Sequence, residues 1–181
     1  MNETKNIIAV YNRASAAELE DGLTWYPNAH DIANQLGNGD VKFGAALLAV
    51  TSPMQKWDRN VKVAFHAVEY GDPYPGMRQT MDKVSRLLSG ENPDTVVSGQ
   101  KVTSFYNNIV DPYGPHVTID RHAYDIAVGK RHTDKTRPSI GKGIYNALSK
   151  AYVEAANELG IAPLALQAIT WVVWRRELGI K

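Results

Sequence analysis

The stretch VKFGAALLAVT, residues 41–51, is apolar on nearly every side and decides the fold. A helix of this kind is buried, so the stretch predicts a central helix against which others pack. The turn GNGD at 37–40 precedes it and Pro53 ends it. Apolar residues at helical spacing recur on both sides, and no alternating runs predict a sheet. We therefore expect an all-α protein.

Working outward, Ser15 and Glu18 have the spacing of a capping box, which predicts a helix start. Pro27 predicts a kink there or a division into two short helices. Met77, Met81, Val84 and Leu88 are expected to share one helix face. Further predicted helices cover 60–70, 77–88, 100–110, 120–128, 145–159 and 163–178. Residues 117–119 are predicted to be extended and 130–142 to form a basic loop.

Composition limits the class of protein. The 181 residues (20.0 kDa) fit one domain, or two small lobes that share a core. With 20 Lys and Arg against 19 Asp and Glu, the net charge of +1 excludes a polybasic tail protein and an acidic nucleic-acid mimic. It leaves nucleic-acid binding open, because that depends on clustered charge.

Metal and membrane sites are not predicted. The absence of Cys excludes disulfides, Cys-ligated zinc and iron–sulfur clusters, and the five His show no metal-ligand spacing. We expect neither a metal nor a cofactor. No signal peptide is apparent, and the longest apolar run, residues 43–50, is far too short to span a bilayer. A cytoplasmic protein is expected.

Gly99, Gln100 and Lys101 stand at a predicted helix start. A glycine there lets the backbone approach a phosphate, and the free N–H groups together with the lysine would hold an anion. The alternative is a plain turn with a surface lysine. Taken alone, this segment favours the plain turn.

A second candidate is Ile119-Asp120-Arg121-His122, where an extended segment meets a helix. Asp120 is a natural N-cap, which would keep it ionised. The same carboxylate could stabilise a developing cation or activate a water molecule. The residues alone leave the structural and the catalytic interpretation equally open.

A third candidate is the loop at 51–60, TSPMQKWDRN, which follows the buried helix. Met54, Gln55 or Trp57 could wedge into a base stack, with Arg59 beside them. The alternative is a helix–helix connection in which Asp58 caps a helix and Trp57 covers the core. Near the C-terminus, Trp171 and Trp174 lie three residues apart, a spacing that favours core packing.

Taken together, the first three segments resemble the helix–hairpin–helix DNA glycosylases, the endonuclease III and 8-oxoguanine glycosylase group. The family pattern L-L-x-V-L-S-x-Q-x-x-D-x-x-V is matched at Gln55, Asp58 and Val61. The family hairpin L-P-G-x-G-x-K-x-A is followed about nineteen residues later by V-D-x-H. Here Lys101 precedes Asp120 by that interval. The resemblance spans roughly residues 40–130.

This resemblance implies a compact helical bundle of two lobes, a single glycosylase-like domain over residues 1–181, without an iron–sulfur cluster. It implies that Asp120 is the catalytic carboxylate, that Lys101 is the Schiff-base nucleophile of a lyase, and that Gln55 fills the space left by an extruded base. The expected DNA contacts are Gln55, Trp57, Arg59, Gly99, Gln100, Arg121 and His122. The expected base pocket is lined by Tyr106, Trp171 and Trp174.

The sequence also departs from the family. Val96 and Val97 stand where the hairpin has Pro and Gly, and the chain is shorter than most family members. The chain further resembles bacteriophage proteins with a V-T-I-D-R-H-A pattern, which would place it in the cytoplasm of a bacterial host. We expect a DNA base-excision glycosylase that acts on double-stranded DNA and needs no obligate protein partner. The alternatives are a phage enzyme that modifies a flipped hypermodified pyrimidine without excision, and a non-catalytic DNA-binding protein.

Overall fold

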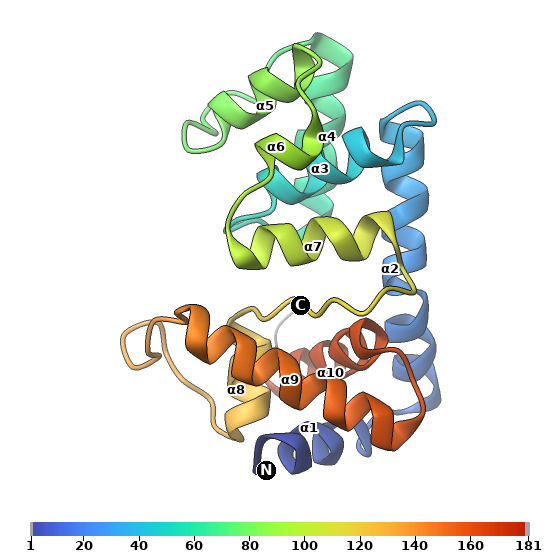
Figure 1. Ribbon diagram of the computed structural model, residues 1–181, viewed down its shortest axis with the longest axis vertical. Helices are drawn as coiled ribbons and strands as arrows, with labels where there is room; N and C mark the ends of the chain where they lie inside the picture. Colours follow the sequence, from blue (N-terminus) through green and yellow to red (C-terminus); the bar gives the residue numbers. More distant parts are fainter. Residues whose placement is uncertain (1, 180–181) are drawn as a thin grey trace. The chain divides into compact units, whose positions relative to one another are not determined.

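The computed structural model describes residues 2–179, and within that range the chain forms helices and no β-strand (Figure 1). The expected all-α class is therefore confirmed. The helices are α1 (Asn2–Tyr11), α2 (Ala16–Leu36), α3 (Val41–Thr51), α4 (Trp57–Tyr70), α5 (Met81–Leu88), α6 (Pro93–Val96), α7 (Gln100–Val110), α8 (Arg121–Val128), α9 (Lys142–Leu159) and α10 (Pro163–Glu177).

The chain divides into two compact units. Unit 1 combines Met1–Pro27 with Pro112–Lys181, and unit 2 is Asn28–Asp111. Unit 2 is thus an insertion between two segments of unit 1. Helix α2 contributes its first part to unit 1 and its second part to unit 2. Each unit is described by itself below.

Unit 2 is built around α3, as the sequence predicted. Eight consecutive residues of α3, Gly44 to Thr51, are buried. The carboxylate of Asp40 caps the helix by accepting a hydrogen bond from the backbone N–H of Phe43, at 3.0 Å. A Cβ at Gly44 would collide with the carbonyl group of Ala33 in α2. Only glycine therefore permits the close approach of α3 to α2.

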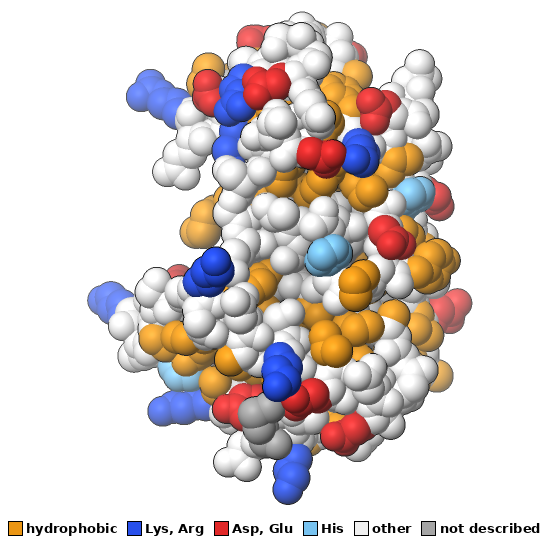
Figure 2. Space-filling model, in the orientation of Figure 1, with side chains coloured by type: hydrophobic (Ala, Val, Ile, Leu, Met, Phe, Trp, Pro, Cys, Tyr) orange, Lys and Arg blue, Asp and Glu red, His pale blue; other side chains and the backbone are white. Residues whose placement is uncertain are grey.

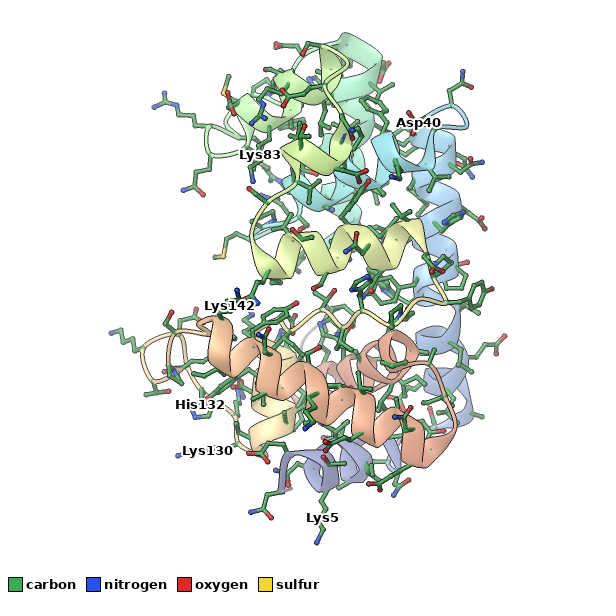
Figure 3. All side chains as sticks on the ribbon, viewed as in Figure 1. Lys5, Asp40, Lys83, Lys130, His132 and Lys142 are labelled. Carbon is green, nitrogen blue, oxygen red and sulfur yellow. The ribbon has the colours of Figure 1, made fainter. Side chains whose placement is uncertain are left out.

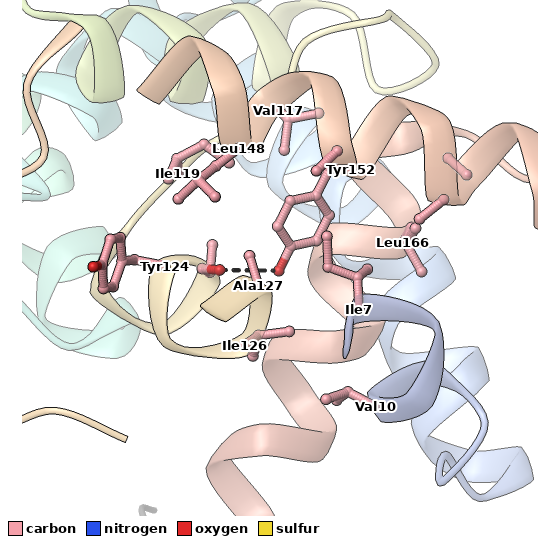
Figure 4. Close-up of a cluster of buried hydrophobic side chains, with 14 of the residues drawn as sticks. Ile7, Val10, Val117, Ile119, Tyr124, Ile126, Ala127, Leu148, Tyr152 and Leu166 are labelled. Atoms are coloured by element: carbon pink, nitrogen blue, oxygen red, sulfur yellow. Dashed lines mark hydrogen bonds between the residues drawn. The ribbon is translucent and has the colours of Figure 1, made fainter. Parts of the chain in front are cut away.

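The core of unit 1 is formed by α1, α8, α9 and α10, together with the extended segment before α8 (Figure 4). Tyr152 lies at its centre, fully buried, and its hydroxyl donates to the carbonyl of Ala123 at 3.5 Å. Ile126 and Leu166 pack against it from α8 and α10. This core fixes the start of α8, where the second candidate segment lies.

The start of α2 confirms the predicted capping box. The carboxylate of Glu18 accepts hydrogen bonds from the backbone N–H and the hydroxyl of Ser15, at 2.9 and 2.8 Å. The backbone N–H of Glu18 is 3.3 Å from the Ser15 hydroxyl oxygen. Of the two outcomes predicted at Pro27, a kink or a division into two short helices, the division does not occur, because α2 continues through Pro27 over 21 residues. Contacts on both sides of the proline, from Tyr26 and His30, hold the flanking turns in place.

Other expected boundaries shift by a few residues. Helix α4 begins three residues before the predicted start, and α5 begins at Met81, because Met77 lies in a turn. Val84 and Leu87 form the buried face of α5, whereas Met81 is 43% exposed. The prediction assumed a helix that begins at residue 77, whereas α5 begins at Met81, so the residues assigned to its first turns do not lie on its buried face. Helix α1 was not predicted.

Candidate functional site

Asp120 is the N-cap of α8, as expected. One oxygen, Oδ1, accepts hydrogen bonds from the backbone N–H groups of His122 and Ala123, at 2.9 and 2.8 Å. The other oxygen, Oδ2, makes no hydrogen bond within residues 2–179 and is not sealed in the core. The carboxylate is therefore fixed in orientation while one oxygen stays available.

Tyr145 fixes the extended segment that leads to Asp120. Its hydroxyl donates to the carbonyl of Val117 at 3.0 Å and accepts from the backbone N–H of Ile119 at 3.2 Å. The side chains of Val117 and Ile119 are buried in the core of unit 1. No sequence signal identified Tyr145, because it lies 26 and 28 residues further along the chain.

His122 follows Asp120 on the first turn of α8 and is only 9% exposed. Burial lowers the pKa of its imidazole, although the nearby Asp120 carboxylate opposes that shift. Its Nδ1 is buried and has no hydrogen-bond partner in the described part of the chain. Trp174 of α10 has an indole N–H in the same condition. Together with Oε1 of Glu18, unit 1 holds three buried side-chain polar atoms that have no hydrogen-bond partner in the described part of the chain.

Trp171 and Arg121 have partners within unit 1. The guanidinium of Arg175 lies over the Trp171 ring, 4.3 Å from its centroid, and Trp25 meets the same ring edge-on. Arg121 is exposed, and its Nη1 lies 3.9 Å from Oδ1 of Asp134. Packing thus accounts for Trp171, as the sequence favoured, while Arg121 keeps its donors near the surface.

A buried ionic cluster lies at the end of α8. Asp125 is 1% exposed, and its Oδ2 accepts from Nη2 of Arg137 at 2.8 Å. Its Oδ1 is 2.9 Å from Nδ1 of His132, which must carry the proton because a carboxylate only accepts. Burial raises the pKa of Asp125, but the hydrogen bonds from Arg137 and His132 bring it below its ordinary value. This cluster was missed because its members come from separate segments.

In unit 2, the start of α7 has the expected form. Gly99 is the N-cap, with φ of 88°, and no side chain caps the helix. The hydroxyl of Ser98 is held by Nζ of Lys83 at 2.7 Å. Lys101 is exposed and has no hydrogen bond or ion pair among the described residues. Gly99, Gln100 and Lys101 together place exposed donors at the positive end of a helix.

In the loop between α3 and α4, the exposed apolar side chain is that of Met54, whereas Gln55 is the residue expected to fill the space left by an extruded base. Gln55 is half-buried, and its Nε2 lies 3.5 Å from the sulfur of Met77. Met54 instead is 89% exposed and adopts φ of 62°, a left-handed conformation that costs energy for a methionine, unlike a glycine. An exposed, strained, apolar side chain at a loop tip is a functional candidate.

The residues that support this loop are polar and buried. Asn60 accepts a hydrogen bond from the Thr51 hydroxyl at 2.7 Å and donates to the carbonyl of Leu48 at 2.9 Å. These contacts tie the start of α4 to the end of α3. Trp57 meets Phe105 edge-on, and Arg59 lies 6.0 Å from the ring centroid of Tyr74. Both predicted contact residues thus begin α4, with Arg59 exposed.

Tyr106 is buried in unit 2, and its hydroxyl donates to Oδ1 of Asp94 at 2.7 Å. Burial and this hydrogen bond raise the pKa of Tyr106. Lys42 pairs with the other oxygen of Asp94 at 2.7 Å. The hydroxyl of Tyr106 is therefore already committed to a structural hydrogen bond.

The structure assigns the predicted residues to two groups. Unit 1 holds Asp120, Arg121, His122, Trp171 and Trp174, and unit 2 holds Gln55, Trp57, Arg59, Gly99, Gln100, Lys101 and Tyr106. Within residues 2–179, no group of three or more His, Asp or Glu side chains could hold a metal ion. No single described helix is long and apolar enough to cross a membrane. Among the described helices, only the pair α9 and α10 reaches the necessary length and apolar content, when the two helices are counted together, and this pair is bent by 97°.

These observations define the chain as an all-α protein with a capped, half-available carboxylate at a helix start. The chain belongs to the Family of unknown function (DUF7178), whose family model matches residues 1–178. No curated protein and no solved structure matches it.

Proposed function

We propose that this protein is a DNA base-excision glycosylase that acts on a flipped damaged or modified base. The observation that carries the proposal is the geometry of Asp120. Its Oδ1 is fixed by two backbone N–H groups, and its Oδ2 has no partner among the described residues. The resemblance of residues 40–130 to the helix–hairpin–helix glycosylases supports the same function.

In this function Asp120 acts on the sugar of the flipped nucleotide. Cleavage of the glycosidic bond leaves positive charge on the deoxyribose ring, which a fixed carboxylate stabilises. The two hydrogen bonds to Oδ1 keep the group ionised and aimed. The free Oδ2 orients the attacking nucleophile, because it is the only oxygen of the pair without a donor among residues 2–179.

Two features of unit 2 suit the DNA strand. The uncapped start of α7, with Gly99 and Lys101, offers N–H groups and a cation to a backbone phosphate. In the loop before α4, Met54 fills the space left by the extruded base, with Gln55 beside it. Extrusion of a base breaks its pairing and stacking, which costs on the order of a few kcal/mol. This cost is lower for a damaged pair.

Lys101 is the candidate nucleophile for strand cleavage. In that mechanism its neutral amine attacks C1′ of the deoxyribose while the bond between C1′ and the base breaks, and the departing base takes up the proton that the amine loses. Opening of the sugar ring then gives a Schiff base, which promotes β-elimination of the 3′ phosphate. The Nζ of Lys101 is exposed and has no hydrogen bond or ion pair within residues 2–179, so it is accessible to DNA. Borohydride reduces such an intermediate to a stable protein–DNA cross-link. A lyase gives this cross-link, and Lys101→Ala abolishes it.

The experiment that tests the function is mass spectrometry of free bases and nucleosides released from DNA. The duplexes contain uracil, 8-oxoguanine, 5-hydroxymethyluracil or a hypermodified pyrimidine. We expect the wild-type protein to release one of these bases. Asp120→Asn should lower the rate at least about 100-fold, because an amide cannot stabilise the developing cation. Asparagine caps helices as well as aspartate does, so the variant should fold normally.

The control variant is Asp40→Asn, which makes the corresponding change at the N-cap of α3. It should leave base release unchanged. Release by Asp120→Asn at the wild-type rate would contradict the assignment of Asp120. A changed nucleoside mass without a free base would replace excision by base modification. DNA binding with no change to any base would leave only a binding protein.

A further inference from the structure

The loop between α8 and α9, residues 129–141, carries exposed cations without partners in the described part of the chain. Lys130, Arg131 and Lys135 are exposed, and none has a hydrogen bond or ion pair through its side chain within residues 2–179. Figure 1 shows this loop standing out from unit 1 between the two helices. We call residues 129–141 the basic loop.

The acidic groups near the basic loop are already neutralised. Asp134 pairs with Nη1 of Arg137 at 3.1 Å and lies 3.9 Å from Arg121. Asp125 is occupied by Arg137 and His132. The acidic charge is therefore matched within the protein, and the charge left facing solvent is positive. In Figure 2, Lys and Arg side chains stand out on the side of unit 1 where the loop lies.

Buried hydrogen bonds anchor the basic loop to α8. Arg137 donates to both oxygens of Asp125, at 3.2 and 2.8 Å, and to the carbonyl of His132 at 2.8 Å. Its side chain and that of His132 are largely buried. A loop that is ordered before binding loses less conformational entropy when it engages a partner. The buried contacts thus present the exposed cations in fixed positions.

Lys142 extends this surface at the start of α9. A cation in the first turn of a helix opposes the helix macrodipole, and α9 has neither an acidic residue there nor a side-chain cap. Stability of α9 therefore does not explain this lysine. Figure 3 shows Lys130, His132 and Lys142 along the same side of unit 1.

The basic loop is also connected to Asp120. Asp134 in the loop faces Arg121, the residue that follows Asp120 at the start of α8. Exposed cations and the half-available carboxylate thus belong to adjoining parts of one unit. A strand whose sugar lies at Asp120 carries phosphates on both sides of that sugar. The exposed cations of the basic loop complement the negative charge of these phosphates.

We propose that the basic loop binds the phosphates of double-stranded DNA beside the nucleotide on which Asp120 acts. The position beside that nucleotide rests on the proposed function, whereas the phosphate binding does not. Lys130, Arg131, Lys135 and Lys142 supply the contacts. Such contacts release counterions from DNA, so each makes binding more sensitive to salt, with a slope in log K against log salt of about 0.9 per contact.

The test is a titration of a fluorescent duplex with the whole protein over a series of salt concentrations. The variant Lys130→Ala/Lys135→Ala should reduce the magnitude of the salt slope by about 2 and weaken binding at least about tenfold at moderate salt. The control, Lys5→Ala/Lys150→Ala, removes the same charge from exposed positions of unit 1 outside the loop. It should bind within about twofold of the wild type. All four side chains are exposed, so thermal unfolding should be unchanged in both variants.

Base release is measured on the same samples. An unchanged salt slope in Lys130→Ala/Lys135→Ala overturns the loop proposal and leaves the proposed function standing. An equal loss in the control variant also overturns it, since net charge alone then explains the effect. A wild-type protein that does not bind DNA overturns both proposals. Binding that depends on the loop, without release of any base, supports phosphate binding and overturns the glycosylase function.

Discussion

The two carboxylate oxygens of Asp120 differ in their hydrogen bonds. Oδ1 caps α8, an interaction typically worth about 1 kcal/mol, while Oδ2 is left without a donor in the described chain. Tyr145 holds the preceding backbone through Val117 and Ile119. The carboxylate is therefore fixed both by its own helix and by a tyrosine from α9. Such fixation matters because a stabilising charge must already be aimed when the cation forms.

Met54 provides a prediction at the same scale. Its left-handed backbone costs about 1 to 2 kcal/mol in a residue with a side chain, and its side chain is almost fully exposed. Met54→Gly should therefore raise the free energy of unfolding by about 1 kcal/mol, after allowance for the greater freedom of glycine in the unfolded chain. Base release should fall at least about tenfold, because the variant lacks the side chain that we propose fills the space left by the base. Urea unfolding and release assays measure the two effects.

Asn38 is the matched control, because it too has a positive φ, of 48°. Asparagine tolerates this conformation, so Asn38→Gly should gain less stability than Met54→Gly and should not change base release. Loss of stability in Met54→Gly would mean that the methionine packs rather than protrudes. Full activity in that variant would exclude Met54 as the wedge.

At the scale of the element, α8 and the basic loop are joined through Asp125. The pKa of this carboxyl is lowered in the folded protein. Its contribution to stability is therefore complete above the ordinary carboxyl pKa and is lost as pH falls through the folded value. Asp125→Asn should cost about 3 kcal/mol near neutral pH, because it removes the buried charge that Arg137 pairs with and leaves only the exposed Asp134 as its charged partner. Thermal unfolding from pH 7 to pH 2 should show a smaller gap between variant and wild type at the acid end.

Glu91 offers a contrast for this experiment. It also pairs with an arginine, Arg86, but both side chains are partly exposed. Glu91→Gln should change the unfolding temperature much less than Asp125→Asn at neutral pH, because solvent screens an exposed pair. Equal effects of the two substitutions would contradict the special importance of Asp125. Trypsin should cut the basic loop faster in Asp125→Asn than in the wild type.

Sequence predicted the parts of the candidate site that depend on neighbouring residues. The capping box of Ser15 and Glu18, the glycine start of α7 and the cap at Asp120 each lie within four residues. Their geometry depends on the local backbone conformation, and the residue types at these positions have known preferences for that conformation. The burial of α3 could also be predicted from neighbouring residues, because they are apolar on nearly every side of the helix.

The remaining parts depend on contacts between distant segments. Tyr145 reaches back 26 and 28 residues, and Arg137 reaches Asp125 over a separation of 12. Nothing in the local pattern of either residue indicates its partner. Pro27 misled for the opposite reason, because its local tendency to break a helix is overridden by the packing of the turns beside it. The exposure of Met54 likewise follows from its loop conformation rather than from its residue type.

At the scale of the whole molecule, unit 2 is inserted into unit 1, and hydrogen bonds join the chain on either side of the two crossings between the units. In unit 2, Nδ1 of His30 lies 2.9 Å from the carbonyl oxygen of Ile109. In unit 1, the hydroxyl of Tyr26 lies 3.3 Å from that of Thr118. The two ends of unit 2 therefore meet within unit 2, and the two segments of unit 1 that flank the insertion meet within unit 1. A closed unit with its own buried core has what independent folding requires.

We predict that residues 28–111 fold alone. The fragment should show a helical circular dichroism spectrum and a cooperative thermal transition, because α3 keeps its packing partners within the fragment. A shorter fragment, residues 40–111, lacks His30 and the Ala33 surface that Gly44 contacts. It should be less stable and less cooperative. A helical spectrum without a cooperative transition in the longer fragment would contradict independent folding.

The insertion also has a consequence for synthesis on the ribosome. The first 27 residues of unit 1 leave the exit tunnel long before α8, α9 and α10 exist to pack with α1. Unit 2, in contrast, is complete once Asp111 has emerged. The inserted unit is therefore the first to complete its core during translation, and α1 must wait with Ile7 and Val10 uncovered. The order in which this protein acquires its structure is thus the reverse of the order in which its two units begin.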